Sequence, residues 1–263
     1  MSDVKILFIV EGATAEKDLY GKLAEKMGLP VKIVSVCANI HMLYGELKKE
    51  QFQLNIADFL LTLNGVSDDD KEMIRQEKPF TYIYLMFDLD PQHYDISKDE
   101  NIIRGLDEVE EMLNVFNDET DPTIGKMYIN YPMIESYRDC SKFFDPDFKN
   151  RTALLDQITD YKKLVGKRGN CINRTKYSLS NFIDLAKMNV FKANYIVNKK
   201  FEGVDYPTYI STLNQEGIFN AQKNPILLDK IIQVLHSGFF FMIDYWGNKN
   251  GFYDKHLNYK EEI

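Results

Sequence analysis

Short apolar runs alternate with longer amphipathic stretches along the first half of the chain. An apolar run of five to ten residues that is rich in β-branched and aromatic side chains is typical of a strand covered on both faces. We therefore expect buried strands at residues 5–10 (KILFIV), 31–38 (VKIVSVCA), 81–90 (TYIYLMFDLD) and 125–132 (GKMYINYP).

The stretches between these runs have the spacing of helices. Residues 14–28 place Leu19, Leu23 and Met27 on one side, with Gly28 as a stop signal, and residues 42–65 are mostly helical up to Asn64-Gly65. Residues 101–118 form an amphipathic helix with Ile103, Leu106, Val109, Leu113 and Phe116 on one side. The resulting β-α-β-α-β-α-β order predicts an α/β fold, a parallel sheet flanked by helices, with functional residues at the carboxyl ends of the strands.

The pattern changes near residue 140. Residues 145–166, 178–199 and 224–247 have helical patterns, separated by loops at 167–176 and 201–209. We predict an α/β domain over residues 1–138 and a mainly helical C-terminal region over 139–263. The apolar runs at the N-terminus and in SGFFFMIDYWG are too short for a signal peptide or a membrane span, so we expect a cytoplasmic protein that does not enter the membrane.

Cysteine and histidine spacing argues against a zinc site. Cys37, Cys140 and Cys171 form no CxxC pair, and the four histidines are equally scattered, so a bound metal would be a hard cation held by oxygen. The net charge of −8 is unevenly distributed: residues 1–138 carry −12 and residues 139–263 carry +4. An acidic half beside a basic one suits a metal site next to a phosphate-binding surface, although a solvated helix face explains the charge equally well.

Carboxylates follow two of the predicted strands. Glu11 follows the first strand, and Asp88 and Asp90 end the third, where alternate residues of a strand share a face. Like charges so close repel unless a cation or a proton offsets them. The three side chains therefore predict a site for Mg²⁺ (or Mn²⁺), in which Glu11 could also act as general acid or base. The alternative interpretation of Glu11 is the cap of the next helix, and that of Asp88 is the cap of a helix or turn.

Several other sites that use acidic or glycine-rich motifs do not fit. An EF-hand loop starting at Asp88 would need glycine at its sixth position and glutamate at its twelfth, where the chain has His93 and Asp99. A haloacid-dehalogenase-type phosphotransferase usually has threonine or valine where Gln92 stands. The turn GATAEKDLYGK is not a P-loop, because it lacks GxxxxGK[ST].

Three segments together resemble a known family: ILFIVEGATAEKDLY, YLMFDLDPQ and YINYPMIESY. They are similar to the Toprim domain, and within it to the RloB-like and OLD-family nucleases of bacterial anti-phage defence, including the nuclease subunit of the PARIS system. The resemblance covers about residues 5–138. The resemblance implies that Glu11, Asp88 and Asp90 bind magnesium. RloB-like members often also have an N-x-P-x-x-E-like segment after the next strand, and Asn130, Pro132 and Glu135 match it. The role of Glu16 is left open, and the C-terminal half resembles no family.

Basic residues after the α/β half are candidates for contacts with phosphate. Lysine and arginine supply the salt-sensitive part of nucleic-acid affinity. The candidates are Arg138, Lys142, Lys162, Lys163, Lys167, Arg168 and Arg174. We expect the aromatic residues among them, such as Tyr137 and Phe143, to belong to the core rather than to stack on bases, and we expect His93 and Asp95 to form a polar turn.

The leading hypothesis is a magnesium-dependent nuclease that cleaves DNA or RNA, with catalytic residues Glu11, Asp88, Asp90 and Glu135. The resemblance implies a defence role with a partner ATPase of the ABC or SMC type. The FFFMIDYW segment, if exposed, would be a surface for a homodimer or for a partner. Two alternatives stay open: a non-catalytic regulatory subunit that keeps the fold, and a metal-dependent small-molecule phosphotransferase or phosphatase. The latter would need a closed pocket instead of an open basic groove.

Overall fold

The structure is a computed structural model that describes residues 4–52, 55–169, 176–247 and 251–257. Internal packing divides the chain into two compact units: Met1–Asp90 with Asp107–Tyr128, and Pro91–Leu106 with Ile129–Ile263. Helix α5 (Asp99–Val115) and strand β5 (Gly125–Tyr131) contribute residues to both units. The domain division at residue 138 stays a prediction, and the two units are described one at a time.

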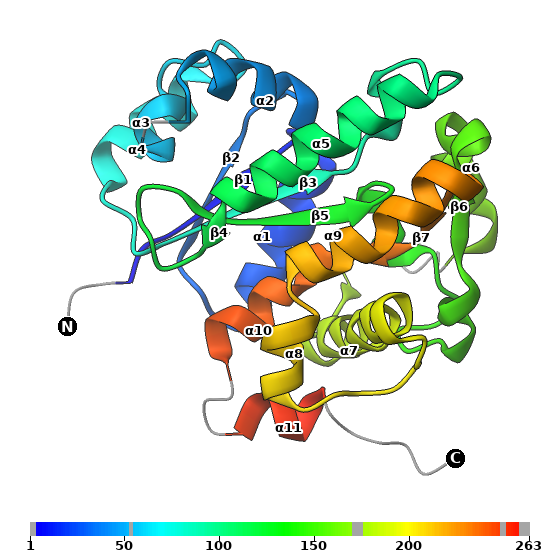
Figure 1. The fold of residues 1–263 in the computed structure, drawn as a ribbon. Helices are drawn as coiled ribbons and strands as arrows, with labels where there is room; N and C mark the ends of the chain where they lie inside the picture. Colours follow the sequence, from blue (N-terminus) through cyan, green and yellow to red (C-terminus); the bar gives the residue numbers. More distant parts are fainter. Residues whose placement is uncertain (1–3, 53–54, 170–175, 248–250, 258–263) are drawn as a thin grey trace. The chain divides into compact units, whose positions relative to one another are not determined.

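The first unit contains a mainly parallel sheet in the order β2-β1-β3-β5-β4 (Figure 1). Strand β1 (Ile6–Val10) pairs in parallel with both β2 (Val31–Ser35) and β3 (Tyr82–Asp88). The short β4 (Asn117–Asp118) pairs antiparallel with β5. Every side chain of β1 is buried, as expected of the central region of a sheet covered on both faces. The predicted α/β class, with helices flanking a parallel sheet, is confirmed.

Local signals place the helices of the first unit. Asn39 and Ser67 cap the N-termini of their helices by accepting backbone N–H bonds from Met42 and Asp70. Gly28 ends its helix in the left-handed conformation, with φ of 69°, which confirms the predicted stop. The helices are α1 (Ala15–Met27), α2 (Ile40–Lys49), α3 (Ile56–Leu60) and α4 (Asp68–Glu77).

Helix α5 confirms the predicted amphipathic helix, but its buried side differs from the predicted one at the first turn. Ile103 is 43% exposed, whereas Ile102 is 6% exposed and joins Leu106, Val109 and Leu113 in the core. Spacing alone allowed both isoleucines, since each lies within one residue of the same helical stripe.

The second unit combines helices with short strands. Strands β6 (Thr152–Leu154) and β7 (Ile231–Gln233) pair antiparallel, and β8 (Leu235–His236) pairs with the end of β5. The helices are α6 (Tyr161–Arg168), α7 (Leu179–Asn198), α8 (Tyr206–Thr212), α9 (Gln215–Asn224), α10 (Phe241–Trp246) and α11 (Phe252–His256), with 3₁₀ turns at Pro91–His93, Ile134–Arg138, Pro146–Asn150, Leu155–Asp160 and Ser237–Phe240. Among the described helices, none is both long and apolar enough to span a bilayer.

Two of the three predicted helical segments after residue 140 are wrong in part. The α7 helix confirms the prediction for 178–199, with a capping box between Ser178 and Asn181. Residues 145–166 instead contain β6 and two 3₁₀ turns before α6, and residues 224–247 contain a π-helical turn at Pro225–Asp229 followed by β7 and β8. These strands exist because two segments about 80 residues apart pair with each other, as in the register of Ala153 with Ile232. A local pattern does not contain that information.

The apolar first part of the FFFMIDYW segment is buried, as predicted, whereas Asp244, Tyr245 and Trp246 are half-buried. Phe239 to Ile243 are all fully buried, within the 3₁₀ turn Ser237–Phe240 and α10.

Candidate functional site

Glu11 and Asp88 meet at the carboxyl edge of the sheet in the first unit. The parallel register pairs Val10 of β1 with Met86 of β3, so the residues that follow these two strands emerge beside each other. A side-chain oxygen of Glu11, Oε2, accepts the backbone N–H of Asp88 over 3.3 Å. The structure thus brings together two of the predicted site residues, for the reason that strand order implied.

Asp90 lies near Glu11 as predicted, but in a turn after β3 and not within the strand. Strand β3 ends at Asp88, and Asp90 adopts the left-handed conformation with φ of 50°. The prediction that the two aspartates lie side by side on one continuous strand is therefore wrong. Aspartate tolerates this backbone conformation better than most residues. The chain turns at Asp90, which acts on Glu11 through space as a neighbouring negative charge.

Glu16 is a fourth carboxylate at this edge, and Gly12 makes room for it. Glu16 lies in the first turn of α1 and is 9% exposed. A methyl group placed on Gly12 would lie 2.4 Å from a carboxylate oxygen of Glu16, so a residue larger than glycine does not fit here without a shift. The sequence left the role of Glu16 open. The structure places its carboxylate against the turn that carries Glu11.

The surroundings of Glu11 raise its pKa from 4.5 to about 8. Burial contributes most, followed by the negative charges of Asp90 and Glu16, while the hydrogen bond from the Asp88 N–H acts in the opposite direction. Both charged side chains that shift this pKa are acidic. This raised pKa favours the protonated form of the Glu11 carboxyl at neutral pH, and a bound cation would compete with that proton.

The donor atoms at this edge are suited to a hard divalent cation. Within the described residues, no three His, Cys, Asp or Glu side chains converge closely enough to form a ready metal centre. The side chains that act on Glu11 as charges, Asp90 and Glu16, are carboxylates, however, and carboxylate oxygen is the ligand that Mg²⁺ and Mn²⁺ prefer. A cation would also relieve the repulsion that raises the pKa of Glu11. The chemistry of the donors fits the predicted metal, and Glu11, Asp88 and Asp90 are the residues that would hold it.

Ser35, which was not among the predicted site residues, supports the Glu11 turn. Its hydroxyl donates to the backbone carbonyl of Glu11 over 3.0 Å and accepts the N–H of Cys37 over 3.2 Å. Ser35 is 2% exposed. The available signal was a serine in the middle of the predicted buried strand at 31–38, since a buried hydroxyl needs hydrogen-bond partners.

Glu135 and Lys162 form an ion pair in the second unit. Glu135 lies in the 3₁₀ turn Ile134–Arg138, is 6% exposed, and contacts the Lys162 ammonium over 3.0 Å. Lys162 remains largely exposed. These two residues were predicted to have separate roles, one catalytic and one in binding phosphate, and the structure joins them.

Arg168 belongs to a buried network instead of an open basic surface. Its guanidinium donates two hydrogen bonds, over 2.8 and 2.7 Å, to the two carboxylate oxygens of Asp139, which is fully buried. The Tyr161 hydroxyl donates to the same carboxylate over 2.9 Å. The bidentate geometry engages the face of the guanidinium that would bind phosphate. We therefore leave Arg168 out of the nucleic-acid surface.

The remaining basic candidates differ in exposure. Lys142, Lys163 and Lys167 are exposed, and Arg138 is half-buried. Arg174 and Cys171 lie outside the described residues.

The remaining polar and aromatic candidates form a turn or pack against other side chains. Asp95 accepts the backbone N–H and the hydroxyl of Ser97, which confirms the predicted polar turn. Tyr137 is buried, and the ring of Phe143 packs edge-on against Tyr177. The core interpretation is confirmed for Tyr137, whereas Phe143 is half-buried.

Comparison of the chain with protein-family models, with curated proteins and with solved structures finds no match.

Proposed function

We propose that this protein is a magnesium-dependent nuclease that hydrolyses phosphodiester bonds in DNA or RNA. The observation that carries the proposal is the position of the half-buried Glu11 at the carboxyl edge of β1 and β3, where burial and its acidic neighbours raise its pKa. Carboxylates placed this close together repel one another, and residues whose pKa is strongly shifted in this way are concentrated at functional sites. The resemblance of the three quoted segments to Toprim nucleases supports the same assignment.

Each carboxylate has a proposed role. Glu11, Asp88 and Asp90 would hold Mg²⁺ or Mn²⁺, which when bound supplies charge neutralisation at a phosphodiester and activation of a water. The raised pKa of Glu11 suits it to accept or donate a proton near neutral pH, because proton transfer is most effective when the pKa of the group lies near the working pH. Glu16 would add a negative charge beside Glu11 and so help to keep the pKa of Glu11 high.

The exposed lysines of the second unit are proposed to contact the nucleic-acid backbone. Lys163 and Lys167 lie on α6, where Lys162 also remains largely exposed despite its pairing with Glu135. Such contacts supply affinity without base specificity, so their loss would weaken binding uniformly and reduce its salt dependence. A role in bacterial anti-phage defence, with an ABC- or SMC-type ATPase as partner, follows from the resemblance alone and belongs to this proposal.

The experiment is a cleavage assay with the purified full chain. Plasmid, single-stranded DNA, total RNA and tRNA are each incubated with Mg²⁺, Mn²⁺ or EDTA, together with the Glu11→Ala and Asp88→Ala variants. We expect metal-dependent cleavage of at least one substrate and a loss of about a hundredfold or more in both variants.

The matched control is Glu72→Ala, which removes a carboxylate from the exposed surface of α4 and should leave cleavage unchanged. Metal binding without cleavage would indicate an enzyme that needs its partner. Neither cleavage nor metal binding would contradict the proposal and favour a regulatory subunit. Turnover of p-nitrophenyl phosphate without nucleic-acid cleavage would favour the phosphatase alternative.

A further inference from the structure

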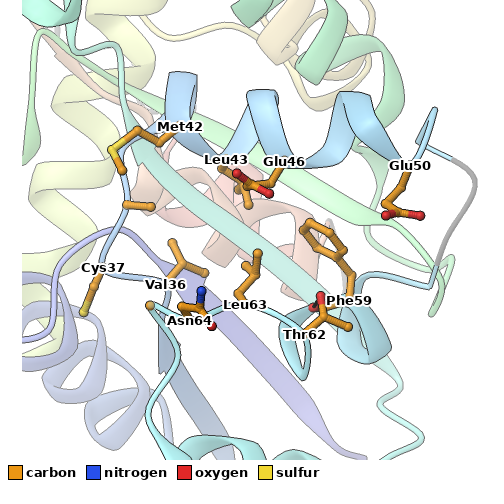
Figure 2. A pocket seen from close by; sticks show the side chains of 12 residues that line it. Val36, Cys37, Met42, Leu43, Glu46, Glu50, Phe59, Thr62, Leu63 and Asn64 are labelled. Carbon is orange, nitrogen blue, oxygen red and sulfur yellow. Dashed lines mark hydrogen bonds between the residues drawn. The ribbon is translucent and has the colours of Figure 1, made fainter.

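A pocket of about 410 Å³ lies in the first unit beside the end of β2 (Figure 2). Its walls come from the segment after β2, from α2, and from α3 with the residues that follow it. A volume in this range is typical of sites for small organic ligands. No part of the proposed nuclease function uses this pocket.

The lining combines apolar walls with acidic groups. Val36, Leu43 and Phe59 are buried, and they supply the apolar surface. Among the described residues that line the pocket, the charged ones are Glu46 and Glu50. Figure 2 shows both glutamate side chains extending from α2 and its C-terminal end toward the side on which Phe59 lies.

Hydrogen bonds and a close backbone approach fix the walls. A methyl group on Gly65 would lie 2.0 Å from the carbonyl oxygen of Val36, so the two backbone segments are in direct contact. The Thr62 hydroxyl donates to the carbonyl of Phe59 over 2.8 Å. The Asn39 side chain holds the first turn of α2. A pocket with fixed walls needs little ordering when a ligand binds, which lowers the entropic cost of binding.

We propose that this pocket binds a small molecule with an apolar body and a positively charged amino group. The apolar walls would cover the body of the ligand, as in most small-molecule sites. The two glutamates would attract the cation and disfavour a carboxylate of the same size. The salt bridge from Lys49 to Glu46, over 2.7 Å, joins two exposed groups, and such pairs are weak enough for a ligand ammonium to compete.

The test uses the full chain labelled with ¹³C in its methionine methyl groups. Met42 lines the pocket and is 54% exposed, so its methyl signal, assigned with Met42→Leu, reports on a ligand there. Phenethylamine and 3-phenylpropionate serve as probes of similar size and opposite charge. We expect a saturable shift of the Met42 signal, with phenethylamine binding at least about threefold more tightly, as expected for exposed ion pairs.

Two variants separate the charge effect from general changes. Glu46→Gln with Glu50→Gln should bring the affinities of the two probes to within about twofold of each other. Asp69→Asn with Glu72→Gln removes the same formal charge from α4, outside the pocket, and should keep the preference.

A blocking variant checks the location. Thr62→Trp places a large ring at the wall of the pocket and should abolish the saturable shift for both probes while the other methionine signals stay unchanged. The absence of a saturable shift with wild-type protein would overturn the proposal. Equal affinity for the two probes, or a preference that survives Glu46→Gln with Glu50→Gln, would also overturn it. None of these results depends on nuclease activity.

Discussion

Replacing Glu11 by glutamine tests the electrostatics of the candidate site directly. Glutamine has the shape of glutamic acid, and its side-chain oxygen can accept the same N–H of Asp88 that Oε2 of Glu11 accepts over 3.3 Å. The substitution removes the ability to ionise and little else. Its effect on stability should therefore follow the titration of Glu11.

The magnitude follows from the shift in pKa. The pKa of Glu11 rises from 4.5 to about 8 on folding, which at about 1.4 kcal/mol for each pH unit corresponds to about 5 kcal/mol. Glu11 keeps some contact with solvent, so we discount this to about 2–5 kcal/mol. Because the folded state holds the proton more tightly, this stability is fully present below pH 4.5 and is lost as the pH rises to about 8.

The assay is urea unfolding of wild-type and Glu11→Gln protein between pH 4.5 and 8.5, with EDTA present so that no divalent cation competes with the proton. We expect the free energies of unfolding of the two proteins to be similar at pH 4.5. The variant should become progressively more stable than wild type, by about 2–5 kcal/mol near pH 8.5. Glu72→Gln, an identical substitution on the exposed surface of α4, should show no such trend.

A difference in the free energy of unfolding between wild type and Glu11→Gln that does not change with pH, whether zero or constant, would refute the reasoning, because Glu11 would then not titrate in this range. A stabilisation of the variant that is the same at every pH would point to packing instead of ionisation. Repeating the series with Mg²⁺ then tests the metal: a cation held by Glu11 should stabilise wild type above pH 7 more than it stabilises the variant.

Two further predictions concern residues that hold the structure together. Gly65→Ala should destabilise the folded chain by about 2 kcal/mol or more, because the new methyl group meets the carbonyl oxygen of Val36. Gly45→Ala, at an open position inside α2, should instead stabilise the folded chain by about 0.5–1 kcal/mol. Thermal unfolding of the two variants measures both effects. Asp139→Asn and Arg168→Met should each cost about 3 kcal/mol in urea unfolding, and a double-mutant cycle that gives no coupling would contradict the assigned ion pair.

Local patterns in the sequence were sufficient for the elements that depend on local forces. The run 5–10 is almost wholly apolar and became the fully buried β1. Gly28 ended α1 with a positive φ, which glycine adopts without steric cost. The alternation of strand and helix then determined the parallel sheet, because parallel strands need a crossover between them. Fold class was therefore predictable from residues alone.

Partners that lie far apart in the chain were not predictable in this way. Strands β6 and β7 form because Ala153 and Ile232 meet across about 80 residues, and each segment by itself has a helical pattern. Arg168 was assigned to a phosphate-binding surface from the charge of its neighbours. Its partner in the structure is Asp139, a buried carboxylate 29 positions earlier. A count of charges along the sequence does not distinguish Asp139 from an exposed acidic residue.

The candidate site depends both on local sequence patterns and on residues that are far apart in the chain. The sequence by itself determined that carboxylates follow β1 and β3, and the parallel register places Glu11 beside Asp88. Only the tertiary structure decided that Asp90 turns out of the strand and that Glu16 approaches over Gly12. The physical reason is that the ionisation of Glu11 depends on distances through space and on exclusion of water, and neither quantity is a property of the order of residues.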